Sequence, residues 1–380
     1  MRPVTMADLA ALAGVSSAAV SLALRGSEKI SEDTRSRIAH LAHKHGYVYN
    51  RQAADLRTQT SRTAAVCLHT ISNPVFSGIL AAVERVFWAR GWSVMFGESG
   101  DEIAKQSAFI ARSIESNVAG LIISPAVGTR SRHLEAFGQR LPIVVAGREI
   151  RGGAFDRVCI EYEKGLTSAV AHLVSLGHQA IGWMGGGSNT ATARRGIRTY
   201  RRVLLKHGLR PSNLWEYICP PSRHDGYVGM RQFLKVAPEL TAVVCFSDLL
   251  AIGAMRALHQ QGMIPGRDMS VIGFDDLEEA EYAFPPLSTV HIDLGRLGER
   301  AAEFLLARVE NRLTPRQEAS IAVELVLRQT TAPPPSAHTG SARRLQSAKR
   351  TQSRIKDGDY DHDSDGPGVG SPQTRLPFLR

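Results

Sequence analysis

The chain has 380 residues, of which 43% are hydrophobic, so it is long enough to bury the cores of two or three domains. Its formal net charge of +10 favours a polyanionic partner. The sequence has no N-terminal signal segment and no apolar run long enough to cross a bilayer, which excludes a membrane-spanning protein and predicts a cytoplasmic one. The four cysteines are far apart and form no Cys-x-x-Cys, so we expect reduced thiols.

Residues 1–49 predict a small helical head. Thr5 followed by Asp8 is typical of a helix start, because each side chain can bind a backbone N–H group that the first turn leaves free. Gly14 is expected to end this helix in the left-handed conformation, and Ser16 to cap a second short helix. Two short helices joined by a tight turn are typical of the helix-turn-helix unit that enters the DNA major groove, although an ordinary helical pair has the same local pattern.

Residues 50–62 predict a hinge between the head and the rest of the chain. Residues 51–56 are expected to form a brief helix that Asn50 begins, and residues 57–62 are polar enough for a linker.

From residue 63 to about residue 331, short apolar runs alternate with amphipathic segments. Alternation of this kind predicts parallel sheets with helices on both faces, and the ligand sites of such sheets lie where the strands end. We expect strands at 64–68, 92–96, 120–124, 143–146, 180–184, 242–246 and 270–274, and helices at 74–89, 105–116, 164–176, 195–207, 226–234 and 251–261.

Residues 332–380 have a different composition and predict a disordered tail. The segment has three prolines at 333–335, carries eight Lys/Arg against five acidic residues, and cannot build a core. Its run Asp361-x-Asp363-x-Asp365-Gly366 is similar to the start of a calcium loop. The position of the twelfth ligand is occupied by Pro372, so we expect no metal site.

Several motifs, taken in order, resemble those of the lactose repressor/purine repressor (LacI) family over about residues 4–331. The head carries Val4-Thr5-x-x-Asp8-x-Ala10-x-x-Ala13-Gly14-Val15-Ser16-x-x-x-Val20-Ser21, continued by Thr34, Gly46-Tyr47, Asn50-Arg51 and Leu56. The core carries Asn73-Pro-Val-Phe76, His172-Leu-Val-Ser-Leu-Gly-His178, Ser247-Asp-Leu-Leu-Ala-Ile-Gly-Ala254, Val271-Ile-Gly-Phe-Asp-Asp276 and Pro285-Pro-Leu-Ser-Thr-Val290. The resemblance implies an all-α helix-turn-helix domain joined to an α/β core of two doubly wound parallel-sheet subdomains, similar to periplasmic binding proteins. It also implies a homodimer that binds a small effector between the subdomains.

The resemblance further implies which residues meet an inverted-repeat operator in double-stranded DNA. Ser17, Ala18 and Leu22 occupy positions that read base edges, and this small, largely apolar set suits thymine methyl groups better than bidentate hydrogen bonding. Leu56 occupies the position of a wedge that enters the minor groove. The full set of DNA-contacting positions is Thr5, Ser16, Ser17, Ala18, Ser21, Leu22, Arg25, Thr34, Tyr47, Asn50 and Leu56. Helix capping is the alternative role of each serine or threonine.

The effector-binding positions implied by the resemblance are Asn73, Phe76, Glu161, Arg195, Asp248 and Asp275. Helix capping is an equal alternative for Asp248. Arg195 is chosen although Gly196 stands where ungapped alignment places the family's pocket arginine. The effector is expected to be a sugar or a nucleobase-like metabolite. Glu161 stands where many members have Asp, and this longer acid would shrink the pocket or change its partner, which puts sugar binding in doubt.

Two other function classes compete with an effector-controlled repressor. A solute-binding transport component shares the core architecture, but the head and the missing signal segment argue against it. A sugar- or nucleoside-processing enzyme would need catalytic residues, and the sequence contains no Gly-x-x-x-x-Gly-Lys-Ser/Thr, Gly-x-Ser-x-Gly or His-Glu-x-x-His. We therefore expect no catalytic residue, no cofactor and no enzyme activity.

Overall fold

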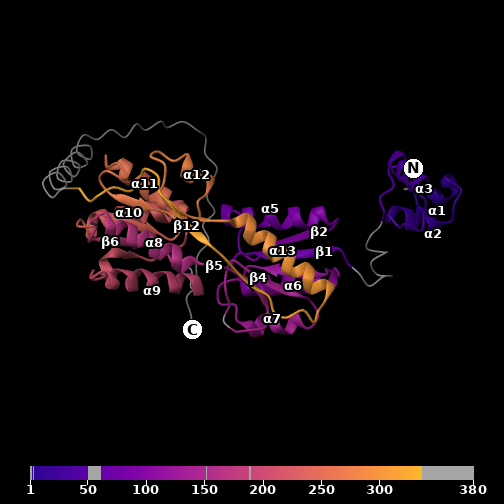
Figure 1. Ribbon diagram of the computed structural model, residues 1–380, viewed down its shortest axis with the longest axis horizontal. Coiled ribbons are helices and arrows are strands. Elements are labelled where there is room, and N and C mark those ends of the chain that lie inside the picture. The colour runs from indigo at the N-terminus through magenta and orange to yellow at the C-terminus, as the bar shows by residue number, and fades with distance from the viewer. Residues whose placement is uncertain (1, 3, 50–60, 151, 188–189, 336–380) are drawn as a thin grey trace, which may run out of the picture. The chain divides into compact units, whose positions relative to one another are not determined.

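The computed structural model describes residues 2, 4–49, 61–150, 152–187 and 190–335 (Figure 1). Its contacts divide the chain into two compact units. Unit 1 comprises Met1–Ile160 and Asp293–Ile321, and unit 2 comprises Glu161–Ile292 and Ala322–Arg380. The predicted hinge helix, with Asn50 and Leu56, lies outside the described residues, as does nearly all of the predicted tail.

The head contains three helices, α1 (Met6–Ala13), α2 (Ser17–Leu24) and α3 (Glu32–Lys44). The Thr5 hydroxyl accepts a hydrogen bond from the Asp8 N–H at 3.3 Å, and the Asp8 carboxylate accepts one from the Thr5 N–H at 2.9 Å. Gly14 has a φ of 62°, the left-handed conformation that glycine adopts without a steric cost. Leu9, Val20 and Ile38 are fully buried where the three helices meet. The expected cap and turn therefore both form.

The core of unit 1 is a six-stranded sheet with the order β11-β5-β4-β3-β1-β2 in which every neighbouring pair is parallel. Figure 1 shows α5 and α13 on one face of this sheet and α6 and α7 on the other. The strands are β1 (Thr63–Leu68), β2 (Ser93–Glu98), β3 (Gly120–Ile123), β4 (Ile143–Ala146), β5 (Asp156–Ile160) and β11 (Glu318–Ile321). The helices are α5 (Pro74–Ala89), α6 (Ile103–Glu115), α7 (Ser131–Gly138) and α13 (Leu294–Glu310).

Unit 2 contains a four-stranded parallel sheet with the order β7-β6-β8-β9 and a separate antiparallel pair, β10 with β12. The helices α10 and α11 cover one face of the sheet, and α8 and α9 cover the other (Figure 1). The strands are β6 (Ile181–Met184), β7 (Glu216–Tyr217), β8 (Ala242–Cys245), β9 (Ser270–Ile272), β10 (Thr289–Ile292) and β12 (Val323–Val326). The helices are α8 (Tyr162–Ser175), α9 (Ala191–Lys206), the 3-10 helix η1 (Asn213–Trp215), α10 (Arg223–Val236), α11 (Asp248–Gln260) and α12 (Glu278–Glu281).

The predicted parallel sheets with helices on both faces are confirmed, and every helix and strand predicted within the described residues is present, most of them with shifted ends. The largest shift is at α9, which begins at Ala191 rather than 195 because the Thr190 hydroxyl caps it, accepting from the Ala193 N–H at 3.1 Å. Nine elements were not expected from the sequence pattern: α7, α12, α13, η1, β5, β7, β10, β11 and β12. Several of these strands are short segments at sheet edges or in the antiparallel pair, where the alternating pattern is weak.

Two further findings concern the cysteines and the hydropathy of the helices. All four cysteines are buried and unbridged. No single helix among the described residues is long and apolar enough to span a membrane, and α1 with α2 passes that test only as a pair bent by 99°.

Candidate functional site

The outer surface of α2 presents the side chains that were predicted to read DNA bases. Ser17 and Ala18 are exposed at its first turn, and Leu22 one turn later is half-buried. Ser16 caps the helix, since its hydroxyl accepts from the Ala19 N–H at 3.1 Å. Ser16 therefore stabilises the start of α2 while Ser17 and Ala18 stay exposed to solvent.

Ser21 differs from the other predicted DNA-contacting residues, because its side chain is buried and only 9% exposed. Its hydroxyl shares a 3.1 Å hydrogen bond with the hydroxyl of Tyr49, and its carbonyl accepts from Nε of exposed Arg25 at 3.1 Å. Ser21 therefore packs the head and positions Arg25 rather than facing solvent.

The predicted phosphate-contacting residues lie at the ends of helices. Thr5 is exposed and holds the capping box of α1. Thr34 is half-buried in the first turn of α3, where its hydroxyl accepts from Ser31 at 2.9 Å. Tyr47 is half-buried after α3, and desolvation, with a smaller contribution from Tyr49, raises the pKa of its phenol. Each of these side chains has a structural bond or contact, and part of its surface stays exposed.

In unit 1, Asn73 and Phe76 follow the carboxyl end of β1, as predicted. The Asn73 side chain caps α5 by accepting from the Val75 N–H at 3.1 Å. Phe76 is buried, and its ring meets the ring of His69 edge-on at 3.9 Å. Asn73 thus has a structural role, and Phe76 supports a histidine that the sequence analysis did not single out.

Three charged or titratable side chains that were not predicted as site residues follow strands of the unit 1 sheet. These are His69 after β1, Asp101 after β2 and Arg148 after β4. Arg148 donates two hydrogen bonds to the Asp101 carboxylate, one of them at 3.1 Å. Burial acts to raise the pKa of Asp101, but the hydrogen bond and the charge of Arg148 outweigh it and lower the pKa. Burial, followed by the charge of Arg148, lowers the pKa of His69 to about 3, so the imidazole is neutral at pH 7.

Near this edge lie four buried polar atoms that have no hydrogen-bond partner within the part of the chain that the structure describes. They are His69 Nδ1, Ser99 Oγ, Gln106 Nε2 and Ser124 Oγ. Ser99 follows β2 and Ser124 follows β3, whereas Gln106 on α6 accepts from the Ala126 N–H at 2.7 Å through its oxygen. Unbonded buried donors and acceptors are uncommon in native proteins, so these atoms are available to a small polar molecule. Their only sequence signal is their position just after a strand or near such a loop.

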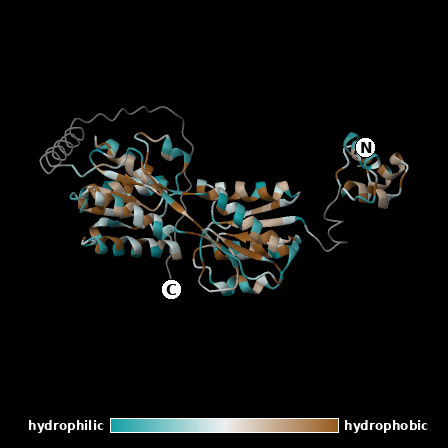
Figure 2. Cartoon of the chain, in the orientation of Figure 1, coloured by the Kyte–Doolittle hydropathy of each residue, from teal (hydrophilic) through white to brown (hydrophobic). Residues whose placement is uncertain are grey.

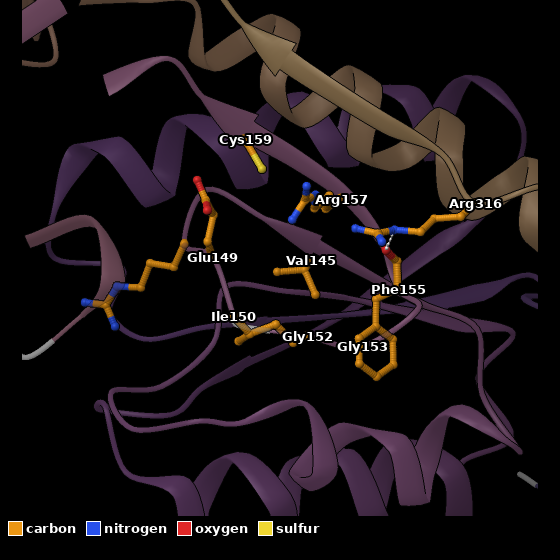
Figure 3. Close-up of a pocket in the computed structure, with 10 residues that line it drawn as sticks. Val145, Glu149, Ile150, Gly152, Gly153, Phe155, Arg157, Cys159 and Arg316 are labelled. Carbon is orange, nitrogen blue, oxygen red and sulfur yellow. Dashed lines mark hydrogen bonds between the residues drawn. The ribbon is translucent and has the colours of Figure 1, made fainter. Parts of the chain in front are cut away.

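Unit 1 also has a concavity that is open to solvent and is lined in part by the loop between β4 and β5 (Figure 3). Arg157 and Arg316 line it, and both approach Glu318: Arg157 bonds to its carboxylate at 2.5 Å and Arg316 lies 3.6 Å away. Arg316 also donates to the Phe155 carbonyl at 3.0 Å, the dashed line in Figure 3. None of the predicted site residues lines this concavity.

In unit 2, the structure brings Asp248 and Asp275 together at the carboxyl ends of β8 and β9. The Asp248 carboxylate is fully buried and accepts from the Leu277 N–H at 2.8 Å and the Thr289 hydroxyl at 2.6 Å. Burial raises the pKa of Asp248 to about 7. Burial, followed by the charge of Asp248, raises the pKa of Asp275 well above its usual range. Asp275 has a φ of 117°, a conformation that is strained for a non-glycine residue and is typical of functional loops.

Glu161 and Arg195, the other two predicted effector residues of unit 2, are engaged in ion pairs. Glu161 pairs with Lys164 at 2.8 Å, and Arg195 approaches Glu163 at 3.7 Å.

The aromatic cluster of unit 2 gathers at the ends of β6, β8 and β9. The Tyr162 ring stacks on Phe274 at 4.0 Å and lies 5.0 Å from Phe246, and its hydroxyl donates to the Phe246 carbonyl at 3.1 Å. A Cβ at Gly196 would lie 3.3 Å from two ring atoms of Trp183 and 3.5 Å from the Tyr162 ring. The position at which the family resemblance leads one to expect an arginine is therefore packed against aromatic side chains.

Comparison with known proteins matches both parts of the chain. Residues 5–50 match the family described as bacterial regulatory proteins, lacI family, and residues 170–331 match a periplasmic binding protein-like domain. The chain is 29% identical over 86% of its length to the transcriptional repressor PurR of Actinobacillus pleuropneumoniae, covering 98% of that protein. It is 27% identical over 81% of its length to the ribose operon repressor of Haemophilus influenzae, covering 92% of that protein.

Two solved structures of transcriptional regulators also superpose on this chain. A Lac repressor dimer bound to operator and the anti-inducer ONPF superposes with a TM-score of 0.77 and 27% identity, covering 87% of this chain and 100% of that chain. The transcriptional regulator CelR in complex with cellobiose superposes with a TM-score of 0.64 and 26% identity, covering 87% of this chain and 100% of that chain.

Proposed function

Because this chain belongs to the lacI family of bacterial regulatory proteins, we propose that it represses transcription as a homodimer on an inverted-repeat operator, under the control of a small effector. The observation that carries the proposal is the capped α2, which exposes Ser17 and Ala18 after a left-handed Gly14. A single head covers a half-site, and a two-fold dimer reads two of them in opposite orientation. The parts of the chain are the head at 1–49, the hinge at 50–62, the core at 63–331 and the tail at 332–380.

Within the head, the roles follow from exposure. Ser17 and Ala18 meet base edges with Leu22, and the remaining surface residues contact phosphates, which fixes the register without reading sequence. The phosphate-contacting residues that the structure describes are Thr5, Ser16, Thr34 and Tyr47, and Arg25 contacts a phosphate or a base. Asn50, also predicted to contact a phosphate, lies outside the described residues. Leu56 is the hinge wedge that enters the minor groove. We assign Ser21 a packing role and not a DNA contact, because its hydroxyl forms a hydrogen bond with the hydroxyl of Tyr49.

The effector is held by residues at the carboxyl ends of strands. Asp275 is the strongest candidate in unit 2. Among the residues that the structure describes, its carboxyl group forms no ion pair, whereas that of Asp276 pairs with Arg328 at 2.7 Å. Phe76 acts in unit 1, where it supports the neutral His69. Four other predicted residues are weaker candidates for effector binding, because each already caps a helix or forms structural polar contacts. They are Glu161, Arg195, Asn73 and Asp248.

The proposal includes a cytoplasmic location and the absence of enzyme activity. A DNA-binding regulator works where the chromosome is, and the relatives that match this chain are named as repressors. The same experiments separate it from a transport component or an enzyme, since neither needs an operator.

Selection of labelled genomic fragments by the purified protein tests the function. We expect enrichment of one or a few inverted repeats. Ala18→Glu, which puts a carboxylate on the exposed start of α2, should abolish the enrichment, because it repels phosphates and base acceptors. Ala11→Glu is the matched control, an equally exposed alanine on α1, and should retain it. No enrichment by the wild type, or equal loss in both variants, would contradict the proposal.

A thermal-shift screen of sugars, nucleobases and related metabolites tests effector control. A ligand that binds only the folded protein raises its melting temperature, by an amount that grows with the logarithm of the ligand concentration divided by its Kd when the ligand is in excess. We expect at least one compound that both raises the melting temperature and changes operator affinity. A stabilising compound that leaves operator affinity unchanged would be a ligand and not an effector.

A further inference from the structure

One face of α9 is a continuous row of cations. Arg198, Arg202 and Lys206 are exposed and spaced four residues apart, so they rise about 6 Å from one to the next along the helix. Exposed Arg201 flanks the row, while Tyr200 and Leu204 turn inward and are fully buried. Figure 2 shows hydrophilic residues along much of α9. We call Arg198, Arg201, Arg202 and Lys206 the cationic face.

Neighbouring acids compensate this face only in part. The sequence contains no acidic residue between Glu163 and Glu216, a stretch that carries eight Lys/Arg. The Glu216 carboxylate accepts two hydrogen bonds from Arg201, at 2.6 and 2.5 Å. Glu163 lies 3.8 Å from Arg202 and is shared with Arg195. Among the residues that the structure describes, no ion pair involves Arg198 or Lys206. The face therefore presents net positive charge that an acidic segment would neutralise.

The chain itself contains such a segment. Asp357, Asp359, Asp361, Asp363 and Asp365 occupy alternate positions, and they are the only acidic residues beyond 324. In an extended chain, alternate side chains point to the same side and repeat about every 6.6 Å. That repeat matches the rise of about 6 Å between successive cations on α9.

The segment can reach α9 without strain. The Ala332 carbonyl accepts from Nε2 of His178 at 2.8 Å, which fastens the start of the tail to unit 2, the unit that contains α9. From 335 to 357 the chain has 22 residues and can span up to about 70 Å, whereas the 16 residues of α9 extend over about 24 Å. Tethering also raises the local concentration of the acids to the millimolar range.

We propose that the aspartate run 357–365 docks along the cationic face of α9 in the same chain and shields that face from nucleic acid. The shielding matters because a DNA-binding protein with an uncovered second cationic surface would gain sequence-independent affinity for phosphate. This proposal does not depend on which operator or effector the protein uses.

Zero-length carbodiimide cross-linking of the full chain, read by mass spectrometry, tests the docking. The reagent joins a carboxylate to an amine in direct contact, and Lys206 is the one amine on the cationic face. We expect cross-links from the aspartate run to Lys206, with a yield that falls as salt rises from about 50 mM to 500 mM, because exposed ion pairs are screened. Lys235 on α10 is the control: it is also exposed in unit 2 but lies on another helix, and should not cross-link.

Charge variants show whether the face itself holds the run. Arg198→Glu with Arg202→Glu should remove the Lys206 cross-link although the lysine remains. The charge-matched control, Arg231→Glu with Arg256→Glu, alters two exposed arginines of unit 2 outside the face and should keep it. Cross-links that join the run only to Lys349 or Lys356 of the tail, or no cross-link to Lys206, would overturn the docking.

Random-sequence DNA tests the shielding. Changing all five aspartates to Asn should strengthen binding to random DNA several-fold at about 100 mM salt. Adding Arg198→Glu with Arg202→Glu should remove that gain, and adding the control pair Arg231→Glu with Arg256→Glu should leave most of it. Equal loss with both pairs would mean that the aspartates act only through net charge, and the shielding would be wrong.

Discussion

The Asp248 carboxylate accepts a hydrogen bond from the Thr289 hydroxyl at 2.6 Å while its other oxygen accepts from the Leu277 N–H at 2.8 Å. These bonds join the first turn of α11 to β10 and to the loop after β9, all within unit 2. Asp248 was predicted either to bind an effector or to cap a helix. Both oxygens are used for holding the loop that carries Asp275.

We predict that Asp248→Ala lowers the free energy of unfolding of unit 2 by about 2–4 kcal/mol, because two buried donors lose their acceptor. Thr289→Val, which removes one donor together with its bond, should cost only about 1 kcal/mol. Urea unfolding followed by fluorescence measures both. Wild-type stability in Asp248→Ala, combined with a lost effector response, would instead assign Asp248 to the ligand.

We predict that the two units respond to pH in opposite directions between about pH 4 and 6.5. The pKa of His69 in unit 1 is lowered to about 3, so the unfolded chain binds a proton that the folded unit rejects, and stability falls as pH falls below about 6.5. The pKa of Asp248 in unit 2 is raised to about 7, so the folded unit binds a proton that the unfolded chain has released. Stability there falls as pH rises from about 4 through 7.

Hydrogen exchange, corrected for the intrinsic effect of pH, reports each unit separately. His69→Gln should flatten the response of unit 1 and leave that of unit 2, whereas Asp248→Asn should do the reverse. Parallel responses in the two units of the wild type would show that other groups dominate.

For the hinge, which lies outside the described residues, we predict that Leu56→Ala weakens operator binding by about tenfold or more and largely spares binding to random DNA. The wedge contributes only where the central base step is unstacked, whereas random DNA is held through phosphates. Leu12→Ala, at an exposed leucine on α1, is the control and should change neither affinity strongly. Equal losses on operator and random DNA would contradict the wedge.

In the core, we predict that Asp275→Ala binds the operator normally but loses its response to the effector. A ligand shifts an equilibrium only through its different affinity for two forms, so removing the contact that carries this difference removes the shift. Operator binding titrated with effector measures the response, and Glu278→Ala, at an exposed acid nearby, should keep it. A wild-type response in Asp275→Ala would move the assignment to another residue.

In the head, we predict a division of roles between two serines of α2. Ser21→Ala should lower the stability of the head by about 1 kcal/mol, because the bond to Tyr49 is lost in a buried position. Ser17→Ala should leave stability unchanged and alter the preferred operator, because Ser17 is exposed and predicted to meet a base edge. Thermal unfolding and selection from randomised operators measure the two effects. Altered base preference in Ser21→Ala at unchanged stability would return Ser21 to the contact set.

The sequence by itself determined the features that depend on residues a few positions apart. The capping pair of Thr5 and Asp8, the turn at Gly14 and the helix 74–89 all appear as predicted, because caps, left-handed turns and helical faces are set by local hydrogen bonds and periodicity. Alternating apolar runs likewise determined parallel sheets covered by helices.

Only the tertiary structure decided what the side chains at the strand ends touch. Arg148 meets Asp101 across 47 residues, and Asp248 meets Thr289 across 41, because the strand order of each sheet brings their loops to one edge. In the sequence, Gly196 stands where the family resemblance predicts an arginine. In the fold, a Cβ at this position would lie 3.3 Å from two ring atoms of Trp183, so the glycine leaves room for that ring. Such contacts depend on how whole strands are ordered and how rings pack, and no spacing within a single segment encodes either.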